Sequence, residues 1–148
     1  MSPSDTPSSP AQAAYRHPVR VYWEDTDAGG IVFYANYLKF FERARTEWLR
    51  SLGIGQQALR DSTGGMFVVS ETSVRYHRPA RLDDLLQVTA ALHSGGRASL
   101  VIAQQAWRLD AEGQATELLC EGTIRIGWVD ASSLRPSRIP SNILESLS

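Results

Sequence analysis

A single long helical pattern, followed by four long β-type segments, limits this chain of 148 residues to a few architectures. The helical pattern runs from about Tyr34 to Leu52, and Gly53 follows as a helix stop. Apolar and aromatic side chains recur along it at steps of four, three and four, and so line one face: Tyr37, Phe41, Ala44 and Trp48. This face must be buried, and the later segments provide the sheet against which it packs.

The β-type segments end at turn signals rich in glycine, proline or acidic residues. They are Phe67–Arg78, Leu85–Ser94, Arg97–Leu109 and Gln114–Val129. Because short turns join antiparallel neighbours, we expect an antiparallel meander whose first two segments form a hairpin about Ala80–Arg81. The alternating stretch Val19–Glu24 predicts a further short strand. Short helices are expected at Ile54–Ser62 and Ser141–Leu147.

The predicted fold class is therefore α+β, with a curved antiparallel sheet of about five strands wrapped around one long central helix. One helix covers one face of such a sheet only if the sheet curls around it. The other face and an edge strand then need cover. A second copy of the chain is the simplest source of that cover, so we expect a homodimer or homotetramer.

Composition narrows the class of protein. Hydrophobic residues make up 43% and charged residues 21% of the chain, and the net charge of −1 gives no electrostatic reason to expect a nucleic-acid partner. No apolar run is long enough for membrane insertion, and one cysteine excludes an internal disulfide, which favours a reducing, cytoplasmic location. We expect one domain at residues 18–130, after a disordered Ser/Pro-rich arm (1–17) without a signal-peptide pattern and before a tail (131–148).

Common catalytic motifs are absent from the sequence. It contains no G-x-S-x-G serine elbow, no phosphate-binding loop and no dinucleotide fingerprint. His17 lies in the arm, and His77 and His93 lie far apart on the expected hairpin, so we predict no metal site. Cys120 lies within a strand pattern and is interpreted as a small buried apolar residue. No cofactor is predicted.

The remaining candidate site is the acidic stretch "EDTDAGGIVFYANYL" ahead of the long helix. Asp25 and Asp27 have a plain structural interpretation, in which they form a turn and stabilise the helix N-terminus by about 1 kcal/mol or less each. However, the glycine pair lets a ligand approach the backbone, and the following apolar residues partly desolvate a nearby carboxylate. Free N–H groups at the helix start face the same space. A carboxylate opposite such donors is the minimum that an attack on a carbonyl group requires.

At this point the residues resemble a family. "VYWEDTDAGGIVFYANYLKFFERARTEWLRSLG" resembles the signature of the YbgC-type acyl-CoA thioesterases, in the 4-hydroxybenzoyl-CoA thioesterase group of hotdog-fold proteins. "RYHRPARLDDLLQV" resembles a second block of the same family, and the resemblance runs from about Val19 to Val129. It implies a hotdog fold, dimers that often pair into tetramers, and hydrolysis of an acyl-CoA thioester to a free acid and coenzyme A.

The resemblance also implies roles for individual residues. The family's catalytic aspartate corresponds to Asp27, whereas Asp25 shapes the loop. The backbone N–H of Tyr34 would polarise the thioester carbonyl, at a position where many members have histidine in a "YHANYL" segment. Substrate and coenzyme A contacts are expected at three positions: Gly30, Arg97 and Ser99. A solvated turn residue is an equally good interpretation of Arg97.

A thioester suits so sparse a site, because a thiolate leaves with little or no protonation while an amine needs a general acid. Whether Asp27 acts as a nucleophile or as a base for water stays open, as does the acyl group. Two other functions on the same fold were weighed. An acyl dehydratase pairs a histidine with its acid, and no histidine accompanies this motif. A non-catalytic acyl-binding protein, or a partner of the Tol-Pal envelope system with which the family is associated, would not need Asp27.

Overall fold

The computed structural model of the protein describes residues 9–11 and 14–147. Its helices and strands follow in this order along the chain: β1 (Tyr15–Arg20), the 3-10 helix η2 (Trp23–Asp25), α1 (Asn36–Ser51), α2 (Gln56–Thr63), β2 (Gly65–Tyr76), β3 (Leu85–Gly95), β4 (Ser99–Leu109), β5 (Ala115–Asp130) and α3 (Ser141–Leu147). None of the helices in the described ranges is both long and apolar enough to cross a bilayer.

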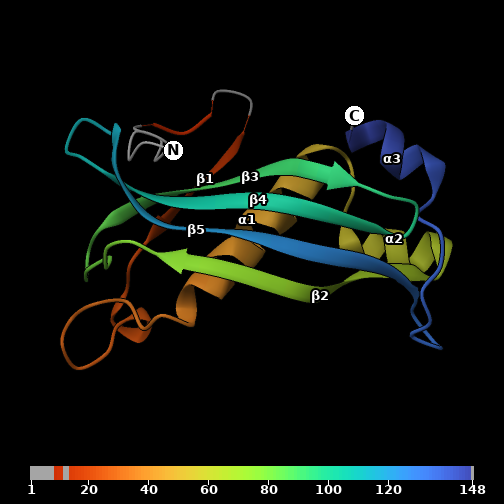
Figure 1. Ribbon diagram of the computed structural model, residues 1–148, viewed down its shortest axis with the longest axis horizontal. Helices are drawn as coiled ribbons and strands as arrows, with labels where there is room; N and C mark the ends of the chain where they lie inside the picture. The colour runs from red at the N-terminus through yellow and green to blue at the C-terminus, as the bar shows by residue number, and fades with distance from the viewer. Residues whose placement is uncertain (1–8, 12–13, 148) are drawn as a thin grey trace, which may run out of the picture.

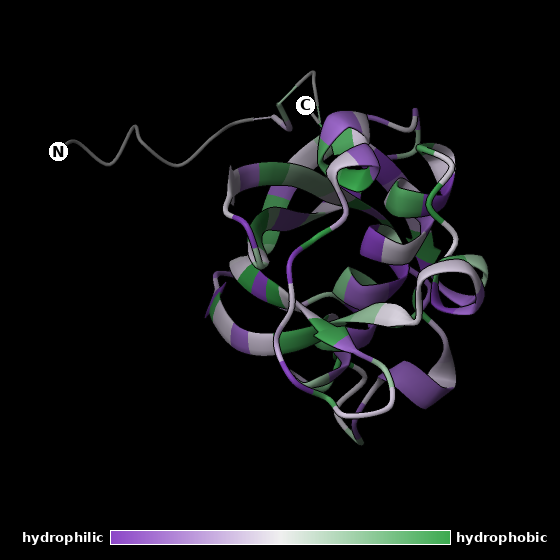
Figure 2. Cartoon of the chain, turned by 90° about the vertical axis from the view of Figure 1, so that its right-hand side faces the viewer, coloured by the Kyte–Doolittle hydropathy of each residue, from purple (hydrophilic) through white to green (hydrophobic). Residues whose placement is uncertain are grey.

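The five strands form one antiparallel sheet in the order β1-β3-β4-β5-β2. The sheet lies along the long helix α1 (Figure 1), and in the end-on view the strands curve around one side of that helix (Figure 2). Helix α1 packs against β1, β3 and β4. The inner face of the edge strand β2 is therefore less covered than the rest of the sheet.

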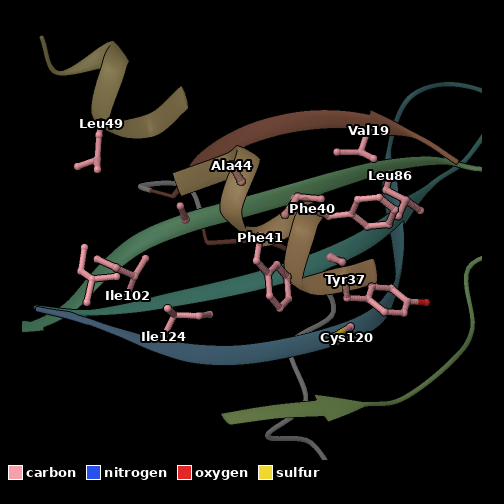
Figure 3. Packing of buried hydrophobic residues seen from close by; sticks show 14 of the residues in the cluster. Val19, Tyr37, Phe40, Phe41, Ala44, Leu49, Leu86, Ile102, Cys120 and Ile124 are labelled. Atoms are coloured by element: carbon pink, nitrogen blue, oxygen red, sulfur yellow. The ribbon is translucent and has the colours of Figure 1, made fainter. Parts of the chain in front are cut away.

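The core lies between α1 and the sheet, and it confirms the predicted apolar face of the helix. Tyr37, Phe41 and Ala44 are buried, and Trp48 packs against the same cluster while partly exposed. Tyr37 and Phe41 point from the helix toward the sheet (Figure 3). Cys120 is fully buried, as predicted.

The predicted meander is correct for β3, β4 and β5 but wrong for β2. The segment Phe67–Arg78 does not form a hairpin with Leu85–Ser94: β2 pairs with β5, on the far edge of the sheet from β1. Residues 77–84, which join β2 to β3, are too many for a tight hairpin turn and carry the chain across the end of the sheet. There they bond to the loop ahead of α1, where the N–H of Val32 donates to the carbonyl of Ala80 at 2.9 Å.

The first strand begins and ends earlier than predicted. Tyr15 to His17 pair with β3, so they belong to the sheet and not to the predicted arm (1–17), whose residues 1–8 and 12–13 lie outside the described residues. Pro18 weakened the strand pattern here, but β1 is an edge strand, where proline is accommodated. The predicted strand Val19–Glu24 stops at Arg20, because the chain turns into η2.

Candidate active site

The sequence from Asp27 to Gly30 forms a tight turn that leads back toward α1. The N–H of Gly30 donates to the carbonyl of Asp27 at 3.0 Å, and the N–H of Asp27 donates to the carbonyl of Ile31 at 2.9 Å. Gly30 has a φ of 78°, a conformation that disfavours residues with a side chain. The space where its side chain would lie is open, with no described atom within 4 Å. A ligand therefore has room to approach the backbone of Gly30.

A second segment of the chain, residues 80–82 between β2 and β3, is bonded to this turn and to α1. The N–H of Leu82 donates to the carbonyl of Gly30 at 3.1 Å, and Ile31 bridges Arg81. The buried hydroxyl of Tyr37 on α1 accepts the N–H of Ala80 at 2.9 Å. Residues 30–37 and residues 80–82 belong to the two sequence blocks that resemble one family, and these bonds hold the two blocks together at the loop.

Asp25 shapes the loop, as its position ahead of Asp27 led us to expect. Its side chain is buried and accepts the backbone N–H of Tyr22 at 2.8 Å, which closes η2. Its carbonyl accepts the N–H of Phe33 at 3.1 Å and the side-chain amide of Asn36 at 2.8 Å. Asp25 is therefore fully engaged in holding the loop against the helix start.

Helix α1 begins at Asn36, two residues later than the predicted helix start at Tyr34. The carbonyl of Tyr34 already joins the first turn, because it accepts the N–H of Tyr37 at 3.4 Å. The N–H groups of Tyr34 and Ala35 have no acceptor in the part of the chain that the structure describes. Such unpaired N–H groups at a helix start are ready donors for an anion or a developing oxyanion.

The carboxylate of Asp27 is both a turn-forming group and a candidate catalytic group. Its Oδ1 accepts the N–H of Gly29 at 2.8 Å, as expected for a turn-forming aspartate. Its other oxygen has no hydrogen-bond partner among the described residues, and the side chain is exposed. One carboxylate oxygen is held in place while the second is accessible for chemistry.

An aromatic cluster lines the helix start. The rings of Phe33 and Tyr34 lie 4.7 Å apart, and Tyr76 at the end of β2 lies edge-on to both Tyr34 and Tyr37. The hydroxyl of Tyr76 donates to the carbonyl of Tyr34 at 3.0 Å. Burial raises the pKa of Tyr37 and of Tyr76, so both phenols stay protonated at neutral pH. Tyr34 itself is 64% exposed, so its phenol faces the solvent beside this cluster.

The turn between β3 and β4, which carries Arg97 and leads into Ser99, lies at the end of the sheet opposite the loop between η2 and α1, which carries Asp27, Gly30 and Tyr34 (Figure 1). The hydroxyl of Ser99 accepts a hydrogen bond from Arg125 at 3.3 Å, and the carbonyl of Arg97 accepts the N–H of Ile139 at 2.7 Å. One chain therefore brings the candidate catalytic residues together but separates them from the candidate coenzyme A residues.

Sequence reasoning missed three residues that position the site: Asn36, Tyr37 as a hydrogen-bond acceptor, and Tyr76. Tyr37 was identified only as an apolar face residue. Asn36 is a polar side chain at a helix start, a signal that predicts a cap. Tyr76 carried no signal, because its partner depends on the pairing of β2 with β5.

Comparison with known proteins shows the family of the chain. A model of the family described as "Thioesterase superfamily" matches residues 29–114. "Acyl-CoA thioester hydrolase YbgC" of Escherichia coli O157:H7 is 43% identical over 130 residues, which cover 88% of this chain and 92% of that protein. "Acyl-CoA thioesterase YbgC" of Haemophilus influenzae is 40% identical over 129 residues, covering 87% and 90%.

The crystal structure of a mutant 4-hydroxybenzoyl CoA thioesterase, complexed with 4-hydroxybenzoyl CoA, has the same fold. It superposes with a TM-score of 0.83 at 19% identity and covers 91% of this chain and 99% of that chain. The sheet curled around one helix is the hotdog fold of these enzymes. The chain belongs to the thioesterase superfamily and, within it, to the YbgC-type acyl-CoA thioesterases.

Proposed function

We propose that this protein hydrolyses acyl-CoA thioesters at the loop ahead of α1, with Asp27 as the base or nucleophile. The observation that carries the proposal is the accessible Asp27 carboxylate, held on a turn next to a helix start with unpaired N–H groups at Tyr34 and Ala35. The family supports the choice of a thioester, since relatives at 40% and 43% identity are named acyl-CoA thioesterases or thioester hydrolases.

In the proposed reaction, the thioester carbonyl oxygen accepts the backbone N–H of Tyr34, and the negative charge that develops there is stabilised by the helix N-terminus. A new C–O bond forms from a water whose proton passes to Asp27, or from Asp27 itself with later hydrolysis of the anhydride. The C–S bond breaks and coenzyme A leaves as a thiolate. Either route consumes one water and yields a free acid and coenzyme A.

Two copies of the chain complete the proposed site. The turn between β3 and β4, with Arg97 and Ser99, lies at the end of the sheet opposite the loop that carries Asp27 (Figure 1), so we propose that these residues act on one substrate only across two chains. Strand β2 is an edge strand with exposed apolar side chains at Val69 and Tyr76. Antiparallel pairing of two β2 edges about a two-fold axis would bring the Arg97 end of one chain to the Asp27 end of the other. Pairs of such dimers would form a tetramer.

Two measurements test this function. A panel of short, long and aromatic acyl-CoAs is incubated with the purified protein, and thiol release is followed; at least one substrate is expected to turn over. If no acyl-CoA is hydrolysed, the catalytic proposal is wrong and a binding function takes its place. Light scattering should report a dimer or tetramer at micromolar concentration. An active monomer would contradict the two-chain site.

A further inference from the structure

Arg45, in the middle of α1, is a buried charge with no carboxylate within ion-pair distance among the described residues. Its side chain is 9% exposed, and its Nη1 donates to the amide oxygen of Gln104 at 2.9 Å. Gln104 is itself held by the carbonyls of Phe41 and Thr89 at 2.9 and 3.2 Å. No described carboxylate forms an ion pair with Arg45. Burial lowers the pKa of Arg45, because this charge is kept away from water, and the negative charge of Glu42 on the preceding turn of α1 offsets only part of that effect.

The guanidinium borders a pocket of about 150 Å³ between α1 and β2. Leu49, Phe67, Val69 and Ile126 supply apolar walls to this pocket. Glu42 is the other charged residue that borders it, and its carboxylate accepts the hydroxyl of Thr46 at 3.2 Å. The pocket thus combines apolar walls with a positive charge that hydrogen-bonds to a neutral amide and has Glu42 as its only charged neighbour in the described lining.

The open inner face of β2 connects this pocket with the candidate active site. Tyr76 and Val69 pair with Cys120 and Ile126, which are core residues, so both side chains lie on the inner face. Tyr76 and Val69 are nevertheless 44% and 51% exposed, because α1 covers the inner face at β1, β3 and β4 and leaves the edge strand β2 less covered. Tyr76 contacts Tyr34, and Val69 borders the Arg45 pocket.

The length of this strip suits an acyl chain. Tyr34 and Arg45 are eleven residues apart, which corresponds to roughly 16 Å along a helix axis. The arginine side chain leans back toward the helix N-terminus and shortens this distance. An acyl group attached at the helix start can therefore extend along β2 and place its far end near the guanidinium.

We propose that this pocket receives the far end of the acyl group and that Arg45 selects acyl chains ending in a carboxylate. The inference rests on the proposed function and names its substrate class. A terminal carboxylate would form the direct, planar ion pair with the guanidinium that no described carboxylate makes. A terminal methyl group would instead leave the charge buried against apolar atoms, which is unfavourable.

The test compares diacid and simple acyl-CoAs of equal chain length, from about six to twelve carbons. The full-length protein is expected to hydrolyse the better diacid substrate with a kcat/KM about tenfold or more above that of its methyl-ended match, as estimated for one charged hydrogen bond. Arg45→Met keeps the side-chain length and should abolish this ratio. Arg50→Met is the matched control, since Arg50 is exposed and pairs with Glu47 on the same helix, and should keep the ratio.

A second variant protects the test against a folding defect at position 45. Val69→Glu places a carboxylate at the exposed end of the pocket, where it neutralises Arg45 without changing it, and should also abolish the diacid preference. Thermal melts report whether each variant folds. An unchanged ratio in the folded variants overturns the inference.

The remaining outcomes separate this inference from the proposed function. If the wild-type protein hydrolyses other acyl-CoAs but shows no diacid preference, the selection by Arg45 is wrong while the function stands. If Arg45→Met weakens both substrates equally and dissociates the oligomer, a carboxylate of a second copy is the partner of Arg45, which also overturns the inference. If no acyl-CoA is hydrolysed, the function itself fails and the inference fails with it.

Discussion

The two ends of the sheet differ in how firmly they hold their candidate functional residues. At one end, the turn from Asp27 to Gly30 is bonded within itself, to residues 80–82 and, through Asp25, to the side chain of Asn36. At the other end, the Arg97 side chain is exposed and has no hydrogen-bond or ion-pair partner among the described residues. The backbone of that turn is fixed, and the hydroxyl of Ser99 accepts a hydrogen bond from Arg125, but the Arg97 side chain is not held.

This difference matches what each end is proposed to do. Attack on a carbonyl requires reacting atoms held within a fraction of an ångström, so the carboxylate and the N–H donors need a supported loop. Binding the phosphates of a long, flexible coenzyme requires mainly charge, which a mobile arginine supplies. Changes at the Asp27 end should therefore act on turnover, whereas changes at the Arg97 end should act on binding.

The largest effect is expected for Asp27→Asn. Asparagine keeps an oxygen that can accept the N–H of Gly29, so the turn is preserved while the negative charge is lost. We expect kcat to fall by at least about a hundredfold, as for a lost base or nucleophile, with little change in the free energy of unfolding. Steady-state kinetics and urea unfolding measure the two quantities.

Two matched variants control this result. Asp61→Asn changes an exposed carboxylate that accepts the side-chain amide of Gln57 at 3.0 Å on α2, and should leave kcat unchanged. Asp25→Asn changes the buried acid of the loop and should act mainly through loop stability. Near-normal turnover in Asp27→Asn would remove Asp27 from the mechanism.

A smaller loss is expected for Tyr37→Phe, which tests the support beneath the loop. The change leaves the buried N–H of Ala80 without its acceptor, which costs about 1–3 kcal/mol of stability. Since residues 80–82 hold the turn that carries Asp27, kcat should also fall, by about tenfold. Urea unfolding and kinetics give both values.

The control for Tyr37→Phe is Tyr22→Phe. Tyr22 is 61% exposed, and its hydroxyl has no hydrogen-bond partner among the described residues. It should be close to wild type in both assays. If Tyr37→Phe loses stability but keeps full turnover, the support of the loop is structural and does not set the geometry of catalysis.

The fold shows a similar contrast between features that could be predicted from the sequence and features that could not. The helix face, the short helices and the antiparallel β3–β5 meander follow from periodicity and short turns, which are local properties. The partner of β2 is not local: residues 77–84 carry the chain across the end of the sheet and bond there to the loop ahead of α1, a contact between distant segments that the sequence pattern does not indicate. The strand Tyr15–Arg20 was misplaced because an edge position tolerates Pro18, and edge positions are set by the whole sheet.

The candidate site divides in a similar way. Asp27, Gly30 and Tyr34 lie close together in the sequence, so the motif places them on one loop. Tyr76 and the hydroxyl of Tyr37 support that loop from distant parts of the chain, and only the assembled fold shows their contacts. Arg97 and Ser99 were assigned by resemblance, and the position of their turn at the end of the sheet opposite the Asp27 loop follows from the topology, which the sequence did not indicate.

At the Arg97 end the expected effect is modest and confined to binding. Arg97→Ala should raise KM for acyl-CoA about two- to fivefold, as for one exposed charge contact, and leave kcat nearly unchanged. The effect should shrink as salt rises, because exposed charges are screened over about 8 Å at physiological ionic strength. An acyl-pantetheine substrate lacks the nucleotide and should not distinguish the variant from wild type. Equal losses on both substrates would assign Arg97 to the turn alone.

The smallest effect is expected in the labelling of the Cys120 thiol in the folded protein. The labelling rate reports how often the core next to the Asp27 loop becomes accessible to a reagent. Burial raises the pKa of this thiol from an ordinary value near 9 to about 12. Cys120 pairs with Tyr76 and lies in the same core cluster as Tyr37, so a reagent reaches it only if the support of the loop separates from β5. At pH 8.5 the native protein should therefore label far more slowly with a thiol reagent than the urea-unfolded chain.

The same shift has a consequence for stability. Because the folded pKa is raised, the contribution of Cys120 to stability is fully present below about pH 8.5, where the unfolded thiol is protonated. It is lost as the pH rises toward 12, since only the unfolded thiol ionises over this range. Tyr37→Phe should speed labelling at constant pH by loosening the packing above the thiol, while Arg97→Ala should not. If both variants label at the wild-type rate, the core around Cys120 stays closed to the reagent without the Tyr37 hydroxyl. The two ends of the sheet would then differ in their chemistry and not in their rigidity.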